Sequence, residues 1–273
     1  MSEQIVSELI VIDPSCNGFP RLAHGGYVSG VVAGLIGKAA TVTLRSPPPM
    51  GRPLAVRRGE NGVVSLVDVG RVIVKGVPSE VGLEAPAPPE FEESERAAGR
   101  FPSGSSPSPT CLCCGHLRPE GEGLRIFPGP IPDREMVAAP WMPHPAFGDP
   151  HGLVRPEFVW AALDCPGAWG LRLRYEPASR SLTVRMGAQV FETVAVGEPH
   201  VVIGWPIERR RRLLECGSAL FGSDGRLKAI AHAIWMRTPD GRMPGEAGAA
   251  LADAGGPIDA PSGYSSGRYR SSS

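Results

Sequence analysis

The hydrophobic pattern divides the chain into two segments, each with one largely apolar stretch followed by shorter apolar runs. Residues 25–37 (GGYVSGVVAGLIG) are apolar almost all round, which predicts a helix buried within its domain. Residues 156–168 (PEFVWAALDCPGA) predict a second helix, and its proline lies in the first turn, where a missing N–H costs nothing. We therefore expect one central helix in each segment.

Strands are predicted after each helix. Runs rich in β-branched residues, separated by turn residues, predict strands over 40–45, 54–58, 63–69 and 72–77 in the first segment. In the second segment they predict strands over 181–193, 200–206, 211–221 and 227–236. The last two flank Ser223-Asp224-Gly225-Arg226, which is a favourable hairpin turn.

Composition places the boundaries between these segments. Residues 85–110 are rich in Pro, Ser, Gly and Glu, a composition that buries too little apolar surface to order itself, although the first part can pack locally around Phe91. We predict an N-terminal domain over 1–84, a disordered linker over 85–110, a C-terminal domain over 111–237 and a disordered tail over 238–273.

Charge and cysteine content restrict the partners and the compartment. The chain has 28 basic and 28 acidic residues, so no global field favours nucleic acid or an anionic membrane. The N-terminus carries acidic residues where a signal peptide needs positive charge, and no apolar run approaches the length of a membrane span. The six cysteines are unevenly spaced, unlike a disulfide framework. We expect a cytoplasmic protein without nucleic-acid or membrane partners.

The two segments are weakly similar to each other. When residues 16–33 are laid over 147–164 without gaps, Leu22 falls on Leu153 and Val28 on Val159, and the Gly/Pro-rich turns before the two helices coincide. A repeated unit of turn, buried helix and antiparallel strands indicates a duplicated fold whose halves complete each other.

Several stretches resemble one family. Residues 17–30 (NGFPRLAHGGYVSG) resemble the helix start of hotdog-fold acyl-CoA thioesterases, in which His-Gly-Gly opens the central helix. Residues 138–154 and 204–237 resemble the entry loop and the last two strands of that family. The resemblance implies an α+β fold of two tandem hotdogs, each a central helix wrapped by an antiparallel sheet. It also implies an acyl-CoA or acyl-carrier thioester as the bound partner, no cofactor, and a pseudo-dimer that can assemble into homo-oligomers.

The resemblance also implies one composite site. In many such proteins an acidic residue follows nine positions after the His of one hotdog and faces the helix start of the other. The first half has Ala33 at that position, and the second half has Asp164, nine residues after Arg155, which aligns with His24. The two halves therefore retain complementary parts, and only one of two pseudo-symmetric sites is expected to be complete.

We assign roles to four residues of this composite site. The backbone N–H of Gly25 would stabilise an oxyanion at the helix start, an effect worth about 3 kcal/mol. Gly26 would allow close access, and His24 would orient the turn; alternatively, the paired glycines only permit tight packing. Asp164 lies in an apolar run, where a carboxylate is costly unless it is paired or used, so it is the candidate general base or nucleophile. Alternatively, it bonds backbone N–H groups freed where Pro166 breaks the helix.

Weaker candidates lie elsewhere. Asn17 is near a family position that orients substrate but is displaced by one residue, so it either binds substrate or shapes a turn. Arg209 and Arg210 belong to a basic run that either contacts coenzyme A phosphates or forms a solvated turn. Residues 111–116 (CLCCGH) lack a second cysteine pair at zinc-finger spacing, so we expect no metal.

The leading functional interpretation is an acyl-CoA or acyl-carrier thioesterase-like hydrolase. One alternative is a non-catalytic protein that binds acyl thioesters on the same fold. Another is a hotdog hydratase or dehydratase that pairs His24 with Asp164.

Overall fold

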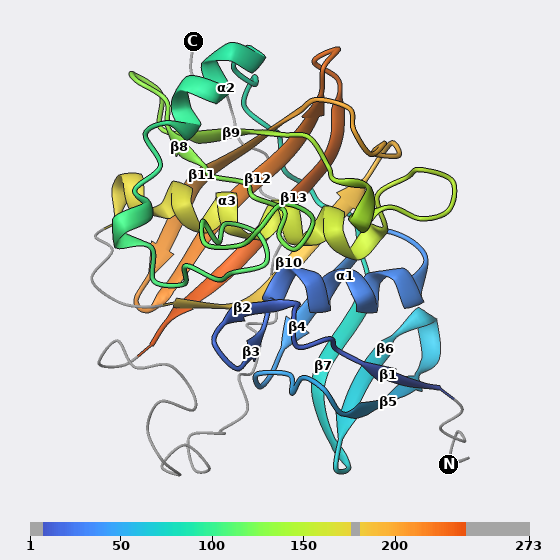
Figure 1. Ribbon diagram of the computed structural model, residues 1–273. Coiled ribbons are helices and arrows are strands. Elements are labelled where there is room, and N and C mark those ends of the chain that lie inside the picture. The colour runs from blue at the N-terminus through green and yellow to red at the C-terminus, as the bar shows by residue number, and fades with distance from the viewer. Residues whose placement is uncertain (1–7, 176–180, 239–273) are drawn as a thin grey trace.

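The computed structural model describes residues 8–175 and 181–238, so the tail predicted to be disordered lies almost wholly outside the described residues. Within them, eleven strands form one antiparallel sheet in the order β1-β5-β6-β7-β4-β10-β13-β12-β11-β9-β8 (Figure 1). Their bounds are β1 (Leu9–Val11), β4 (Ala40–Leu44), β5 (Pro53–Arg58), β6 (Val64–Asp68), β7 (Arg71–Pro78), β8 (Gly129–Pro130), β9 (Val137–Trp141), β10 (Ser181–Val190), β11 (His200–Arg210), β12 (Leu213–Gly222) and β13 (Leu227–Arg237). A separate hairpin pairs β2 (Asn17–Phe19) with β3 (Leu22–Ala23).

Each half of the sheet carries one central helix. Helix α1 (Gly25–Ile36) packs on β4, β6 and β7, whereas α3 (Pro156–Arg174) packs on β11, β12 and β13 (Figure 1). The halves join where β4 pairs with β10, with Ala40 opposite Ala188 and Thr43 opposite Arg185. The main core lies between the two helices and the sheet, and it contains residues from both halves.

The helices also pack against each other in opposite directions, which fixes the site described below. Close contacts pair Gly26 of α1 with Asp164 of α3, and Gly30 with Glu157. The start of α1 therefore lies beside the middle of α3.

The prediction of a disordered linker over residues 85–110 is wrong. Residues 91–98 form helix α2, whose Ser94 and Ala97 are buried against β8 and β9 in a second apolar cluster. Its first turn carries Glu92 and Glu93, which favour the positive end of the helix dipole. Average composition concealed this amphipathic helix, because its many charged residues lie on one exposed face. Short 3₁₀ helices cover Glu60–Gly62 (η1), Ser103–Ser105 (η2) and Pro145–Phe147 (η3).

Helix α3 is longer than predicted. Pro166 lies inside the helix, which continues to Arg174, so the alternative in which Pro166 breaks the helix and frees N–H groups for Asp164 is wrong. Burial of both flanking turns holds the helix together despite the hydrogen bond that proline removes. The helix also approaches the sheet closely here: a Cβ added at Gly204 of β11 would lie 2.0 Å from the Pro166 carbonyl oxygen.

None of the helices in the described part of the chain is both long and apolar enough to cross a membrane.

Candidate active site

Glycines bring the start of α1 against α3. A Cβ added at Gly26 would lie 2.6 Å from the Asp164 Cβ and 2.8 Å from the Trp160 carbonyl oxygen. A Cβ added at Gly30 would lie 2.5 Å from the Glu157 Cα. These separations are shorter than real Cβ contacts, so both glycines serve close helix packing. For Gly26, the packing interpretation of the paired glycines therefore applies.

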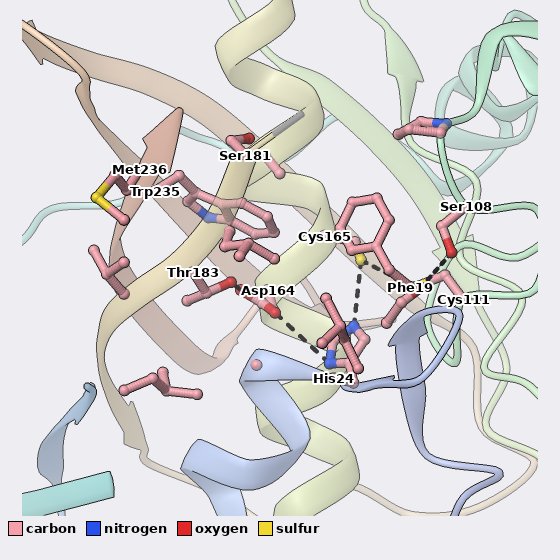
Figure 2. A pocket seen from close by; sticks show the side chains of 18 of the residues that line it. Phe19, His24, Ser108, Cys111, Asp164, Cys165, Ser181, Thr183, Trp235 and Met236 are labelled. Atoms are coloured by element: carbon pink, nitrogen blue, oxygen red, sulfur yellow. Dashed lines mark hydrogen bonds and ion pairs between the residues drawn. The ribbon is translucent and has the colours of Figure 1, made fainter. Parts of the chain in front are cut away.

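The Asp164 carboxylate is buried at this junction and is held by both halves of the chain. Its Oδ2 accepts a hydrogen bond of 2.8 Å from the Gly26 backbone N–H. Its Oδ1 accepts one of 2.9 Å from the hydroxyl of Thr183 on β10, which Figure 2 shows beside Asp164. The side chain is only 2% exposed. Burial raises the pKa of Asp164, although His24 and the two hydrogen bonds oppose this shift.

His24 is the N-cap of α1. Its Nδ1 accepts a hydrogen bond of 3.3 Å from the Tyr27 backbone N–H and lies 3.6 Å from Asp164 Oδ2. Its Nε2 lies 3.4 Å from the Cys165 Sγ (Figure 2). Burial lowers the pKa of His24, but the charges of Cys111 and Asp164 outweigh burial, and the net shift is upward. Both ring nitrogens therefore face protein atoms.

Gly25 and Asp164 face the same pocket. A Cβ added at Gly25 would lie 3.4 Å from Asp164 Oδ2 and 2.8 Å from the Thr183 Oγ1. The Gly26 and Tyr27 N–H groups donate to Asp164 and His24, but none of the hydrogen bonds found among the described residues uses the Gly25 N–H. A donor at the positive end of α1 thus remains available at the pocket wall.

The pocket has a volume of about 310 Å³, within the range of small-molecule sites. Its wall is mostly apolar, and both halves contribute to it. Large apolar and aromatic side chains of the wall are Phe19, Leu22, Leu44, Trp169, Leu171, Leu214, Trp235 and Met236. Such a pocket suits an acyl chain, and Gly25 lies in its wall together with Asp164, which Figure 2 shows beside Thr183 and His24.

The weaker sequence candidates lie outside this pocket. Asn17 donates to the Thr110 carbonyl oxygen at 3.3 Å and accepts from Arg118, so its side chain fastens a loop. Arg209 and Arg210 are at the exposed end of β11, where Arg210 contacts Glu208. Neither arginine lines the pocket.

Three other arginines do line the pocket: Arg45, Arg172 and Arg237. They are far apart in the sequence and belong to no basic run, so no pattern in the sequence points to them. Arg172 stacks over the Trp169 ring, with 4.3 Å between the guanidinium carbon and the ring centroid.

The second pseudo-symmetric position lacks both chemical parts. Arg155 caps α3 as His24 caps α1, in agreement with the internal alignment. The next residue is Pro156, which has no backbone N–H to offer, and Ala33 replaces the carboxylate. Of the two pseudo-symmetric positions, the one at Gly25 and Asp164 therefore combines a helix start that has a backbone N–H with a carboxylate.

Four cysteines lie beside this pocket. Cys111, Cys113 and Cys114 come from the loop before β8, and Cys165 comes from α3; all four are buried and none forms a disulfide. Hydrogen bonds from Cys114 and Cys165 lower the pKa of the Cys111 thiol well below its usual value. No local pattern in the sequence predicts this cluster, because Cys165 is 54 residues away from Cys111 along the chain.

Comparison with known proteins supports the fold. No family model and no curated protein match this sequence. Acyl-CoA thioesterase II TesB2 from Mycobacterium marinum is 13% identical, with a TM-score of 0.54 over 88% of this chain and 97% of its own. The tesB protein of Mycobacterium avium subspecies paratuberculosis is 12% identical, with a TM-score of 0.52 over 80% and 88%. The chain shares the fold of these thioesterases. At such low sequence identity, this similarity concerns the fold alone.

Proposed function

We propose that this chain is a tandem-hotdog hydrolase of acyl-CoA or acyl-carrier thioesters, with one composite site at Gly25 and Asp164. The observation that carries the proposal is the shared pocket, where the unbonded N–H of Gly25 lies beside a buried carboxylate from the other half. In this interpretation the acyl chain occupies the apolar pocket. The thioester carbonyl oxygen accepts a hydrogen bond from Gly25, where the helix dipole favours the charge that develops during attack.

Asp164 would activate the attacking water in this mechanism. Each of its oxygens accepts one hydrogen bond, from Gly26 and Thr183, and keeps a further lone pair for water. The two bonds fix the orientation of the carboxylate toward the carbonyl carbon. We favour the general base over the nucleophile because a carboxylate held at both oxygens has little freedom to move into bonding distance of the substrate.

A non-catalytic acyl-thioester binding protein is the second candidate, and a specific observation supports it. The same two hydrogen bonds, together with the Gly26 contact, give Asp164 a structural role at the α1–α3 junction without any chemistry. A hydratase or dehydratase has less support, because both ring nitrogens of His24 face protein atoms.

Incubation with saturated acyl-CoA esters from short to long chain tests the proposal, with free coenzyme A measured by chromatography because the chain has its own thiols. Hydrolysis of at least one ester supports the enzyme. Binding of a non-hydrolysable S-alkyl coenzyme A by calorimetry, without hydrolysis of any ester, supports the binding protein instead. Hydration of a crotonyl thioester in place of hydrolysis would support the hydratase. Cytoplasmic localisation and the absence of nucleic-acid and membrane partners remain predictions from the sequence.

A further inference from the structure

The cysteine cluster beside the pocket has the geometry of a metal site. The sulfur atoms of Cys111, Cys114 and Cys165 all lie within 4.8 Å of one another. The ligand atoms of His24, Cys113 and Cys165 form a second such group, so Cys165 is common to both. We propose that Cys111, Cys114 and Cys165 bind a zinc ion, with the fourth ligand supplied by His24 or Cys113.

Two separations among these atoms fit tetrahedral zinc, and a shift of the side chain of His24 or Cys113, both of which lie outside the group of three thiols, would complete the coordination. Two thiolates bound at 2.3 Å lie about 3.8 Å apart, and a thiolate and an imidazole nitrogen lie about 3.5 Å apart. The sulfur atoms of Cys111 and Cys165 are 3.6 Å apart, and the Cys165 sulfur is 3.4 Å from the His24 Nε2. A disulfide would require an S–S distance of about 2.05 Å and would use only two of the four thiols.

The loop that carries three of the cysteines is shaped by its backbone. The Gly115 N–H donates to the Cys111 carbonyl oxygen at 3.0 Å, and a Cβ at position 115 would lie 2.4 Å from that oxygen, so the turn requires glycine. Leu124 and Ile126 donate backbone hydrogen bonds to Leu112 and Cys113, at 2.8 and 3.0 Å. The turn and its neighbouring strand-like segment therefore present the thiols in a fixed arrangement.

The segment that carries the three cysteines has little regular structure to stabilise it. Between η2, which ends at Ser105, and β8, which begins at Gly129, the chain contains no helix or strand, yet Leu112, Leu124 and Ile126 are buried. Irregular segments of this length are uncommon in compact domains. A metal that joins the cysteine loop to Cys165 on α3 would stabilise such a segment, because metal-binding free energy becomes folding free energy.

The choice of metal follows from the ligands. Thiolate and imidazole are soft or borderline donors, which favour zinc over calcium or magnesium. The expectation of no metal rested on the lack of a second cysteine pair at zinc-finger spacing, whereas the fold supplies Cys165 and His24 from distant positions. Cys111, Cys114 and Cys165 also line the pocket, so the ion would shape the wall beside Asp164 without taking part in the proposed hydrolysis.

Metal content tests this inference independently of any thioester activity. The full chain, purified without a histidine tag under reducing conditions and without chelator, is expected to contain about one zinc per chain by mass spectrometry. Cys111→Ser and Cys114→Ser should each reduce zinc to background. Cys216→Ser is the matched control and should retain zinc, because Cys216 is buried but belongs to neither group. The proposal would be overturned if the reduced wild-type chain contained no zinc and also failed to bind added zinc. Full zinc content in both the Cys111→Ser and the Cys114→Ser variants would overturn it as well.

Cobalt binding keeps the proposal testable if the variants fail to fold. Wild-type chain stripped with a chelator should melt at a temperature lower by more than about 5 °C. Titration with Co²⁺ should then produce thiolate charge-transfer and tetrahedral d–d bands that saturate at one equivalent and disappear on addition of zinc. The His24→Ala variant identifies the fourth ligand: its cobalt spectrum should differ from that of wild type only if the His24 imidazole binds the ion. Octahedral cobalt spectra without charge-transfer bands, or a disulfide between Cys111 and Cys165 in fresh protein, would contradict the proposal.

Discussion

The Asp164 carboxylate of α3 accepts a hydrogen bond of 2.8 Å from the backbone N–H of Gly26 in the first turn of α1. The two residues are 138 positions apart, and they lie on helices that pack on different halves of the sheet. The bond places a carboxylate from one half beside the helix start of the other, with Gly25 next to it at the pocket wall. The proposed site therefore exists only because both halves pack together.

Close packing at this junction predicts opposite effects for two glycines of the same helix. Gly26→Ala should destabilise the protein by about 1–3 kcal/mol, because the new methyl group would meet the Asp164 Cβ and the Trp160 carbonyl oxygen. Gly34→Ala should stabilise it by about 0.5–1 kcal/mol, because nothing lies within 4 Å of the added carbon and alanine is the better helix former. Urea unfolding of both variants measures the difference. Equal stability changes of the same sign would contradict the described packing.

Gly25→Ala tests the oxyanion role, and urea unfolding of the same variant separates that role from stability, because the added methyl group would also lie 2.8 Å from the Thr183 Cβ. The added methyl group would lie 2.8 Å from the Thr183 Oγ1 and 3.4 Å from Asp164 Oδ2, so it would crowd the pocket wall beside the Gly25 N–H. We expect kcat/KM for a thioester substrate to fall by about 100–1000-fold. The variant is assayed beside Gly34→Ala, whose activity should equal that of wild type. Retention of full activity by Gly25→Ala would remove Gly25 from the mechanism.

Much of this arrangement could be anticipated from the sequence. The largely apolar stretches beginning at Gly25 and Pro156 predict the two central helices, and the internal alignment places His24 and Arg155 at equivalent caps. The hairpin turn before β13 also follows from local chemistry. The close approach of Asp164 to Gly25 was expected from the family resemblance rather than from any local pattern.

Other features depend on contacts that no local pattern reveals. Helix α2 is rich in charge, and its burial depends on Gly129, which leaves room for the Ala97 carbonyl oxygen. The Thr183 hydroxyl reaches Asp164 only because β10 pairs with β4 between the halves. The CLCCGH motif likewise indicates three of the clustered cysteines. Cys165 joins them only through the packing of α3, which no local pattern shows.

A pH-dependent contribution to stability is expected from Glu215 on β12 and His232 on β13, which lie 3.2 Å apart. The hydrogen bond from His232 lowers the pKa of Glu215 below its usual value of 4.5. A carboxyl group whose pKa is lower in the folded state stabilises the protein above its unfolded pKa and loses that contribution as the pH falls through the folded pKa. Because the His232 side chain is 35% exposed, we expect at most about 1 kcal/mol.

Unfolding of wild type and Glu215→Gln between pH 7 and pH 3 measures this contribution. The wild type should be the more stable protein above pH 4.5, and the difference should shrink at lower pH. A difference that grows as the pH falls below 4.5 would show that the sign of this linkage is wrong.

The central claim is that Asp164 is catalytic at a site shared by both halves, and Asp164→Asn tests it most directly. Asparagine keeps the shape and one of the two acceptor oxygens, its amide NH2 can donate to the Thr183 hydroxyl, and it cannot take a proton from water. With the best thioester substrate found for the wild type, we predict that kcat/KM falls at least about 100-fold, while S-alkyl coenzyme A binds within a few-fold of wild type. Asp133→Asn, at an exposed position outside the pocket, is the control and should leave both values unchanged. Undiminished hydrolysis by a folded Asp164→Asn variant would contradict the account.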